Sequence, residues 1–119
     1  MTAFTADQLP VIQQEDGIDV RVAEAGGMTL LWSHLRKGAD LGPTLAGQPG
    51  GQCSAPHWGY MIKGKLLLRT TDGEEVYSAG EAFYWAPGHV PMALEDCELI
   101  DFAPNEAYAK MAGASAVEG

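Results

Sequence analysis

Near its start, the chain alternates apolar and polar residues in a way that predicts β-strands. Residues 18–23 read Ile-Asp-Val-Arg-Val-Ala, and the side chains of a strand alternate between the two faces of a sheet. The pair Gly26-Gly27 follows and can adopt the positive φ angles of a tight turn. Residues 28–35 are again rich in apolar and aromatic side chains. The pattern therefore predicts a β-hairpin over residues 18–35.

Five more strand-like segments follow, and turn residues separate them. Asp72-Gly73 indicates a hairpin, because Gly after Asp satisfies a turn that needs a positive φ angle. Ala86-Pro87-Gly88 indicates a second turn. The predicted strands are residues 57–64, 65–70, 74–78, 82–85 and 97–102.

The remaining segments differ in composition from the strands. Residues 37–52 consist largely of Gly, Pro and small residues and predict a long loop, which inside a compact domain is usually functional or mobile. Residues 1–17 predict an N-terminal arm or edge segment. Residues 104–119 predict a short helix that runs through Met111, followed by a tail. Between these lies the predicted β-barrel, over residues 18–103.

Composition and charge agree with one β domain and exclude several functions. A chain of 119 residues is long enough for a single core, and its 15 Gly and 7 Pro exceed what a helical bundle tolerates. The net charge of −9, with seven basic residues among sixteen acidic ones, argues against nucleic acid and anionic membranes as partners. Neither a long apolar run nor a secretory signal pattern is present. We therefore expect a cytoplasmic protein whose two cysteines are reduced.

Two motifs carry the most specific information. Residues 52–64 read QCSAPHWGYMIKG, and residues 80–89 read GEAFYWAPGH. These stretches resemble the two sequence motifs of the cupin family. The combination Cys-x-x-Pro-His-Trp-Gly-Tyr with a later Pro-Gly-His is similar to a subgroup of small single-domain bacterial cupins. The resemblance implies an all-β fold, a single antiparallel jelly-roll β-barrel with a short C-terminal helix, whose interior usually holds a divalent metal ion.

The residues at the usual cupin ligand positions are changed in this chain. Counted back from the last glycine of the first motif, the family's Glu falls on His57, and its two His positions fall on Cys53 and Gly51. The His of the second motif falls on Pro91, with His89 two residues earlier. The resemblance therefore implies a different ligand set, made of Cys53, His57 and His89.

This ligand set indicates which metal the site would prefer. One thiolate and two imidazoles favour Zn²⁺ and also suit Fe²⁺, Ni²⁺ or Co²⁺, whereas Mg²⁺ and Ca²⁺ prefer oxygen ligands. Three protein ligands leave one position open for water or substrate. The alternative is a pocket without metal, in which Cys53 is a small buried residue and both histidines bond to the backbone. A Cys53–His57 nucleophile pair would need a positive environment that the sequence does not show.

Strand parity orients the segment that carries the first motif. One face of the predicted strand carries His57, Gly59 and Met61. The other face carries Trp58, Tyr60 and Ile62. If residues 53–57 are also extended, Cys53 lies on the His57 face, which in the cupin pattern is the barrel interior. The outer apolar face needs a cover, and the resemblance implies a homodimer that supplies it.

Further residues are candidates for contact with a bound small molecule. His34 could be a fourth ligand, an acid–base group or a strand histidine at the barrel rim. Glu95 could turn inward as a general base or oxygen ligand, or be solvated. The remaining candidates either line the cavity or belong to the core: Met61, Trp32, Phe83 and Trp85.

Taken together, these observations predict metal-assisted chemistry on a small organic metabolite. We expect an isomerase, lyase or cyclase type of reaction, with His57 and His89 as the catalytic residues. One alternative is a non-catalytic binding or sensory cupin that holds a metabolite without metal. A further alternative is a metal-dependent dioxygenase, although oxygen-activating cupins generally keep the His-rich site that this chain has lost.

Overall fold

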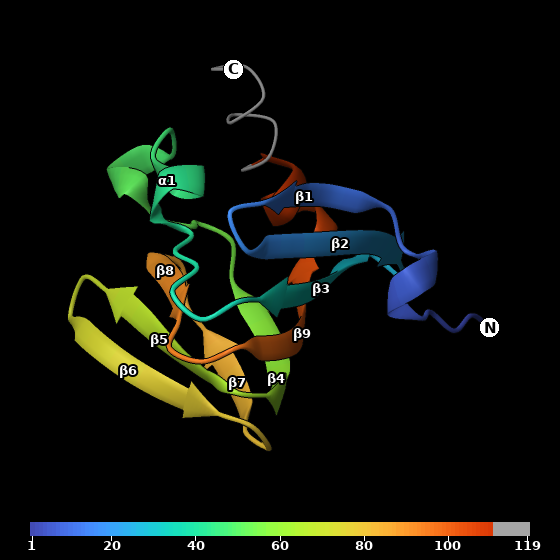
Figure 1. Cartoon of the computed structure of the whole chain (residues 1–119). Coiled ribbons are helices and arrows are strands. Elements are labelled where there is room, and N and C mark those ends of the chain that lie inside the picture. The colour runs from blue at the N-terminus through green and yellow to red at the C-terminus, as the bar shows by residue number, and fades with distance from the viewer. Residues whose placement is uncertain (111–119) are drawn as a thin grey trace.

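Two antiparallel β-sheets face each other in the structure, a computed structural model that describes residues 1–110 (Figure 1). The larger sheet has the spatial order β1 (Val11–Glu15), β2 (Ile18–Ala25), β3 (Met28–Leu35), β9 (Cys97–Pro104), β4 (His57–Lys63) and β7 (Ala82–Trp85). The smaller sheet has the order β6 (Gly73–Ser78), β5 (Lys65–Thr70) and β8 (His89–Ala93). The helical segments are α1 (Gly42–Leu45), two single 3₁₀ turns at Ala6–Gln8 and Pro49–Gly51, and residues 105–110.

The apolar core lies between the two sheets. Leu31, Met61 and Leu99 contribute from the larger sheet, and Leu66 and Leu68 from the smaller one. Met61 and Leu66 have no exposed surface, and complete burial of such a side chain contributes about 1.5–3 kcal/mol. The prediction of an all-β, antiparallel jelly-roll barrel with a short C-terminal helix is confirmed. Met111 and the predicted tail lie outside the described residues.

The first predicted hairpin is present with the expected boundaries. β2 and β3 pair from Ile18↔Leu35 to Ala25↔Met28, and Gly26 and Gly27 occupy the turn with positive φ angles. The alternation of apolar residues in β2 places Ile18 and Val20 in the core. The pattern of the sequence therefore set the register of this hairpin correctly.

Strand β4 has the orientation that parity predicts. His57 and Met61 are buried, whereas Trp58 and Tyr60 are exposed on the outer face. β4 lies between β9 and β7 in the larger sheet. The side chains of the first motif that face inward therefore reach the space between the two sheets.

Two elements of the structure were not predicted. Strand β8 was missed because it contains Pro91, which cannot donate a ladder hydrogen bond; β8 tolerates this residue because it is an edge strand. Helix α1 was missed because the Gly- and Pro-rich composition of residues 37–52 predicted a loop, whereas Pro43 lies in the first turn of the helix, where Pro is tolerated. The segment 37–52 is therefore not a loop throughout.

The N-terminal segment contains an edge strand. β1 pairs with β2, with Glu15 opposite Ile18, and so forms one edge of the larger sheet. The boundaries between the arm, the barrel and the helix-and-tail region stay a prediction. Within residues 1–110, no helix has the length and apolar character that crossing a membrane requires.

Two glycines of the first motif have clear steric roles. Gly64 has a φ of +85°, and a Cβ there would lie 2.2 Å from the Asp96 carbonyl oxygen. This residue lets the chain leave the larger sheet at the end of β4 and enter the smaller one at β5. A Cβ on Gly59 would lie 2.4 Å from Phe83 Cζ and 2.5 Å from the Ile100 carbonyl oxygen. Gly59 therefore leaves room for the ring of Phe83 and for β9.

We expect Gly59→Ala to lower the free energy of unfolding by about 1–3 kcal/mol, because the added methyl group would overpack the interior. Urea unfolding followed by tryptophan fluorescence would measure the change. Gly26→Asn is the control, since a Cβ there meets nothing within 4 Å and Asn tolerates a left-handed conformation. Equal stability of Gly59→Ala and the parent protein would contradict this account of β4.

Candidate metal and ligand site

A cavity of about 400 Å³, called here the central cavity, lies between the two sheets. Aliphatic and aromatic side chains form most of its wall, among them Val20, Leu31, Leu35, Leu66, Trp85 and Leu99. The wall also contains polar side chains, among them Ser33, Gln48, Cys53, His57, His89 and Asp101. A mostly apolar cavity with a few convergent polar groups is typical of a small-molecule site.

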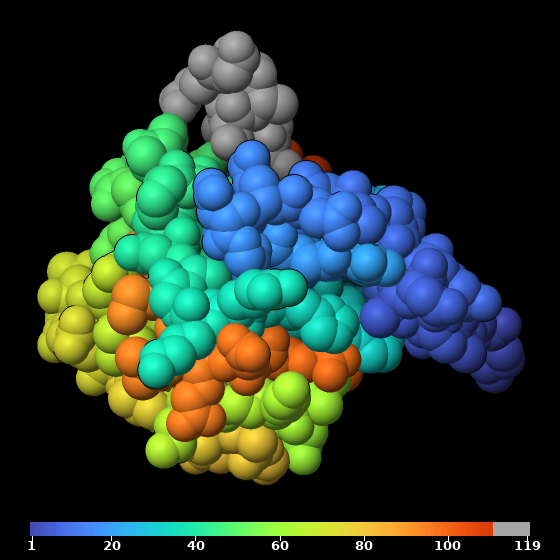
Figure 2. All heavy atoms as spheres, in the orientation of Figure 1, coloured from blue at the N-terminus to red at the C-terminus, as the bar shows by residue number. Residues whose placement is uncertain are grey.

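Strand β1 and helix α1 meet at the exposed edge of the central cavity. Gln13 and Thr44 both line the cavity, and Gln13 Nε2 donates a hydrogen bond of 2.8 Å to Thr44 Oγ1. Figure 2 shows the blue strand of the N-terminal part beside the cyan-to-green segment that follows β3. Two segments 31 residues apart in sequence are therefore joined where the cavity approaches the surface.

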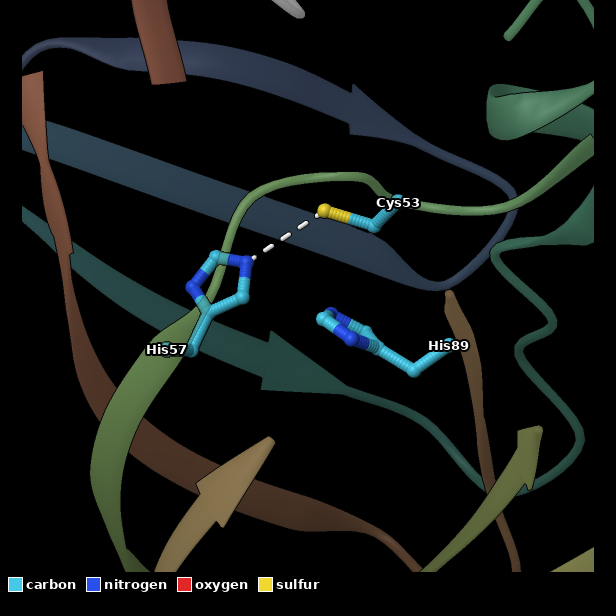
Figure 3. A group of neighbouring side chains, drawn as sticks. All are labelled: Cys53, His57 and His89. Atoms are coloured by element: carbon cyan, nitrogen blue, oxygen red, sulfur yellow. Dashed lines mark hydrogen bonds between the residues drawn. The ribbon is translucent and has the colours of Figure 1, made fainter. Parts of the chain in front are cut away.

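Cys53, His57 and His89 converge on one point of the cavity wall (Figure 3). The Cys53 sulfur and one nitrogen of each histidine all lie within 4.8 Å of one another, and all three residues are buried. His57 begins β4 and His89 begins β8. The backbone brings Cys53 to His89, because Cys53 N–H donates to the His89 carbonyl oxygen at 2.9 Å. The structure thus brings together the three residues that the sequence singled out.

The ring of His89 is oriented by the backbone. Its Nδ1 lies 2.7 Å from the Ala86 carbonyl oxygen, and since a carbonyl oxygen only accepts, Nδ1 carries the proton. In the neutral form of this ring, the lone pair is then on Nε2. This is the tautomer that a ligating histidine needs when it coordinates through Nε2.

The ring of His57 lies between Cys53 and a buried carboxylate that was not predicted. Nε2 of His57 is 3.3 Å from Cys53 Sγ, and Nδ1 is 3.3 Å from Asp101 Oδ1. Asp101 is only 5% exposed and pairs with Gly59 across β4 and β9. The sequence does carry a signal for it. In β9, the positions that share its face are occupied by apolar residues, namely Cys97, Leu99 and Ala103.

Electrostatics favour the charged forms of Cys53 and His57. Burial alone would raise the pKa of the Cys53 thiol, but hydrogen bonds from His57 and His89 and the charge on these rings lower the pKa to about 6. Burial opposes protonation of His57, but the Asp101 carboxylate, together with contact to Cys53, raises the pKa of His57 to about 10. In the protein without metal, the pair is therefore a thiolate and an imidazolium near pH 7.

The second cysteine has no such environment. Cys97 is also buried and free. Burial raises the pKa of the Cys97 thiol to about 11, and the nearby charges of Asp96 and Glu95 act in the same direction. The two thiols of this chain therefore differ strongly in their tendency to ionise, and Cys97 provides an internal reference for Cys53.

The other sequence-predicted site residues divide into three groups: Trp85 in the cavity wall, Phe83 and Met61 in the core, and three residues outside. Trp85 lines the central cavity, Phe83 stacks on Trp85 with ring centroids 4.0 Å apart, and Met61 is fully buried in the core. Trp32, His34 and Glu95 do not line the central cavity.

Strand parity explains why Trp32 and His34 lie outside the cavity, whereas Glu95 lies in the turn between β8 and β9. The Trp32 indole donates to Glu98 at 2.8 Å, and His34 Nε2 is 3.2 Å from the same carboxylate. Along β3, Trp32 and His34 alternate with Leu31, Ser33 and Leu35, which line the cavity. The exposed Glu95 donates its backbone N–H to the Lys65 carbonyl oxygen.

Tyr108 is a cavity residue that the sequence interpretation missed. It belongs to the helical residues 105–110 and lines the central cavity. Burial and the charge of Asp101 raise the pKa of Tyr108 to about 12, so its hydroxyl stays protonated and can donate a hydrogen bond. No feature of the sequence indicated this role, because the predicted helix could have packed elsewhere.

Solved structures with the same architecture identify the fold. KdgF from Halomonas sp. superposes with a TM-score of 0.64 at 25% sequence identity, over 87% of this chain and 94% of that one. An RmlC-like cupin from Shewanella frigidimarina gives a TM-score of 0.62 at 16% identity, over 85% and 88% of the two chains. The barrel is a cupin domain. The sequence resemblance to cupins is thereby confirmed.

The same cupin architecture also occurs within a larger enzyme. A Bacillus subtilis oxalate decarboxylase superposes on 85% of this cupin with a TM-score of 0.66 at 18% identity, although the match covers only 28% of that chain. Another structure of that enzyme is described with Mn(II) centres. No protein-family model and no curated protein matches this cupin by sequence.

We expect the Cys53 thiol of the metal-free cupin to ionise as the pH rises through about 6. Thiolate absorbance in the ultraviolet would follow the titration in a Cys97→Ala variant treated with a chelator. Replacing His57 with Gln removes the cation and should move the midpoint toward the ordinary thiol pKa of about 8.5. A midpoint near that ordinary value in the variant that keeps His57 would refute the thiolate–imidazolium pair.

Proposed function

We propose that this cupin is a divalent-metal-dependent enzyme that acts on a small organic metabolite in the central cavity. The observation that carries the proposal is the convergence of Cys53, His57 and His89 on the cavity wall, with their ligand atoms within 4.8 Å of one another. Three protein ligands beside a cavity leave space for a fourth ligand from water or substrate. The Mn(II) centres of the related oxalate decarboxylase support metal binding in this fold.

The donor set suits a borderline-soft ion. One sulfur and two imidazole nitrogens favour Zn²⁺, and Fe²⁺, Ni²⁺ or Co²⁺ also accept them. Ligand atoms around a single tetrahedral Zn²⁺ lie roughly 3.3–3.6 Å apart, given bond lengths of about 2.0–2.3 Å. The sulfur–nitrogen distance of 3.3 Å between Cys53 and His57 agrees with this spacing. The Ala86 carbonyl oxygen faces Nδ1 of His89, and the Asp101 carboxylate faces Nδ1 of His57. A metal-ligating histidine usually has such a partner at its second nitrogen.

The residues around the ion would hold it in place and bind its substrate. Bound there, the ion would act as a Lewis acid toward a carbonyl or carboxylate oxygen. His57 must release its proton to coordinate, and Asp101 then keeps the remaining ring proton on Nδ1. Tyr108 lines the cavity, so its hydroxyl would donate a hydrogen bond to a bound substrate, and the aliphatic wall would limit the access of water.

The reaction type that we favour is isomerisation, elimination or cyclisation. Each of these needs a polarised oxygen and proton movement but no external oxidant. Metal-dependent dioxygenase activity is a further alternative, and a Cys-containing iron site would be its basis. His57 and His89 are proposed as the catalytic residues in the sense that they hold the ion against the substrate.

The second candidate function is a metal-free cupin that binds or senses a metabolite. It is favoured by the contact between Cys53 and His57, because a thiolate and an imidazolium neutralise each other without an ion. In that state the thiolate would also be available as a nucleophile. The two candidates differ in one measurable property, the metal content.

We expect the purified protein to contain about one equivalent of a transition metal per chain after expression in supplemented medium. Elemental analysis by mass spectrometry would measure it. Cys53→Ala and His57→Ala should each lose most of the metal, and Asp101→Asn should weaken metal affinity by about 10–100-fold. After Co²⁺ loading, a thiolate-to-metal charge-transfer band should appear in the protein that retains Cys53.

Cys97→Ala is the matched control for this experiment, because it removes the other buried thiol of the chain. It should retain the full metal content and the Co²⁺ band. Less than about a tenth of an equivalent of every transition metal in the parent protein would refute the metalloenzyme and leave the binding cupin. Loss of metal in Cys97→Ala to the same extent would show that the assignment of Cys53 is wrong.

The cellular context and the assembly also remain proposals. We propose a cytoplasmic protein, in which Cys53 and Cys97 form no disulfide. We also propose a homodimer. The face that needs a cover is the outer side of β4 and its neighbours, which exposes Trp58, Tyr60, Ile62, Tyr84 and Phe102.

We expect light scattering at micromolar concentration to give the mass of two chains. The double variant Trp58→Glu with Tyr84→Glu should give a monomer, because the two rings lie together on the exposed face with centroids 4.9 Å apart. Val76→Glu is the control, since Val76 is equally an exposed strand residue but lies on the smaller sheet. A monomeric parent protein would contradict the proposed dimer.

A further inference from the structure

The inner face of the larger sheet changes from polar to aliphatic along strand β4. His57 begins this strand, and Met61 lies four residues further along the same face, where it pairs with Leu99 of β9. Leu99 pairs in turn with Ser33 of β3, and Ser33 pairs with Val20 of β2. Because a strand rises about 3.3 Å per residue, this row across the sheet lies about 13 Å along the strands from His57.

The inner face of the smaller sheet changes in the same way. His89 begins β8, and Ala93, four residues further along the same face, pairs with Leu66 of β5. Leu66 has no exposed surface and lines the central cavity. In each sheet, an aliphatic residue of the cavity wall is therefore offset by four residues from the histidine that begins the strand.

The aliphatic residues of both sheets form one part of the central cavity, called here the distal section. Leu35 extends it, because it follows Ser33 by two residues on the same face of β3. Among the described residues that form the distal section, Ser33 is the one polar side chain. All of them are buried and line the cavity: Val20, Ser33, Leu35, Leu66 and Leu99.

The two parts of the cavity would bind different parts of one ligand. An oxygen atom of the ligand that reached an ion between Cys53, His57 and His89 would leave the distal section to the remainder of the molecule. Each methylene group buried there raises the affinity about three- to fourfold. A polar group in the same place would find only Ser33 as a partner, and burial of a polar group without a hydrogen bond is unfavourable.

We infer that the substrate class of this site is an amphipathic metabolite. Its polar head, with a carbonyl or carboxylate oxygen, lies at the end of the cavity that carries Cys53, His57 and His89, and its aliphatic tail lies in the distal section. The position of the head rests on the proposed function, because the ion would bind that oxygen. The tail rests on the shape and apolar character of the distal section, whatever the charge of the head.

Two series of probes with increasing chain length test the inference. Butane-, hexane- and octanehydroxamate carry a metal-binding head and would be titrated into Zn²⁺-loaded protein. The primary straight-chain alcohols butanol, hexanol and octanol would be titrated into chelator-treated protein. Isothermal titration calorimetry should show that the affinity rises about threefold per methylene group in both series.

Affinities that do not change with chain length in either series would overturn the inference, as would a failure of the alcohols to bind. A Zn²⁺-loaded protein that binds none of the hydroxamates would refute the position of the head. These outcomes need only the parent protein and do not depend on the folding of any variant.

Filling the distal section tests where the tail lies. Ser33→Phe places a ring in this section from β3, and Val20→Phe does so from β2. Each should weaken octanol binding at least about tenfold and leave butanol binding within about threefold, because less of a long chain could be buried. Val76→Phe is the control, since it adds the same ring to an exposed position of the smaller sheet. An unchanged dependence on chain length in both Ser33→Phe and Val20→Phe would show that the tail does not occupy the distal section.

The outcomes for the inference and for the proposed function are separable. A protein that takes up no metal but binds longer alcohols more tightly refutes the metalloenzyme and keeps the apolar tail. A protein that binds one metal ion, and whose affinity for hydroxamates does not change with chain length, keeps the metal site and refutes the tail.

Discussion

The site of this cupin depends on one short backbone bridge. The Cys53 N–H donates to the His89 carbonyl oxygen at 2.9 Å, and the Cys53 carbonyl oxygen accepts from the N–H groups of Gly88 at 2.8 Å and His89 at 3.4 Å. This bridge ties the segment that leads into β4 of the larger sheet to the start of β8 in the smaller one. Without it, the thiol and the second imidazole would belong to separate sheets. The chemistry of the cavity therefore begins with main-chain pairing.

Near that bridge, the buried ionisable side chains of Asp101, His57 and Cys53 lie in contact with one another. Asp101 is buried on a face of β9 whose other residues are apolar, and its burial is tolerated because His57 lies against it. His57 in turn contacts the Cys53 thiol. Burial of any one of these groups alone would be costly. Together they form a compact polar region in a mostly apolar cavity.

The sequence predicted much of this arrangement, because its strongest signals are local. The alternation in β2 and β4 identified the buried face correctly, and the motif around Cys53 and His57 located the first half of the site. His89 was located by the Pro-Gly-His of the second motif. Contacts between strands that are distant in sequence were harder to predict. Asp101 and Tyr108 reach the cavity only through the pairing of β9 with β4 and the docking of residues 105–110, neither of which a periodic pattern specifies.

Pro91 has a consequence for the way this protein can associate. It removes a hydrogen-bond donor from the outer strand β8, and the Leu41 N–H already occupies the Pro91 carbonyl. At the opposite border of the smaller sheet, β6 presents the exposed acidic residues Glu74 and Glu75. Both borders of that sheet thus resist the addition of a foreign strand, which protects the molecule against fibril-like self-assembly through this sheet.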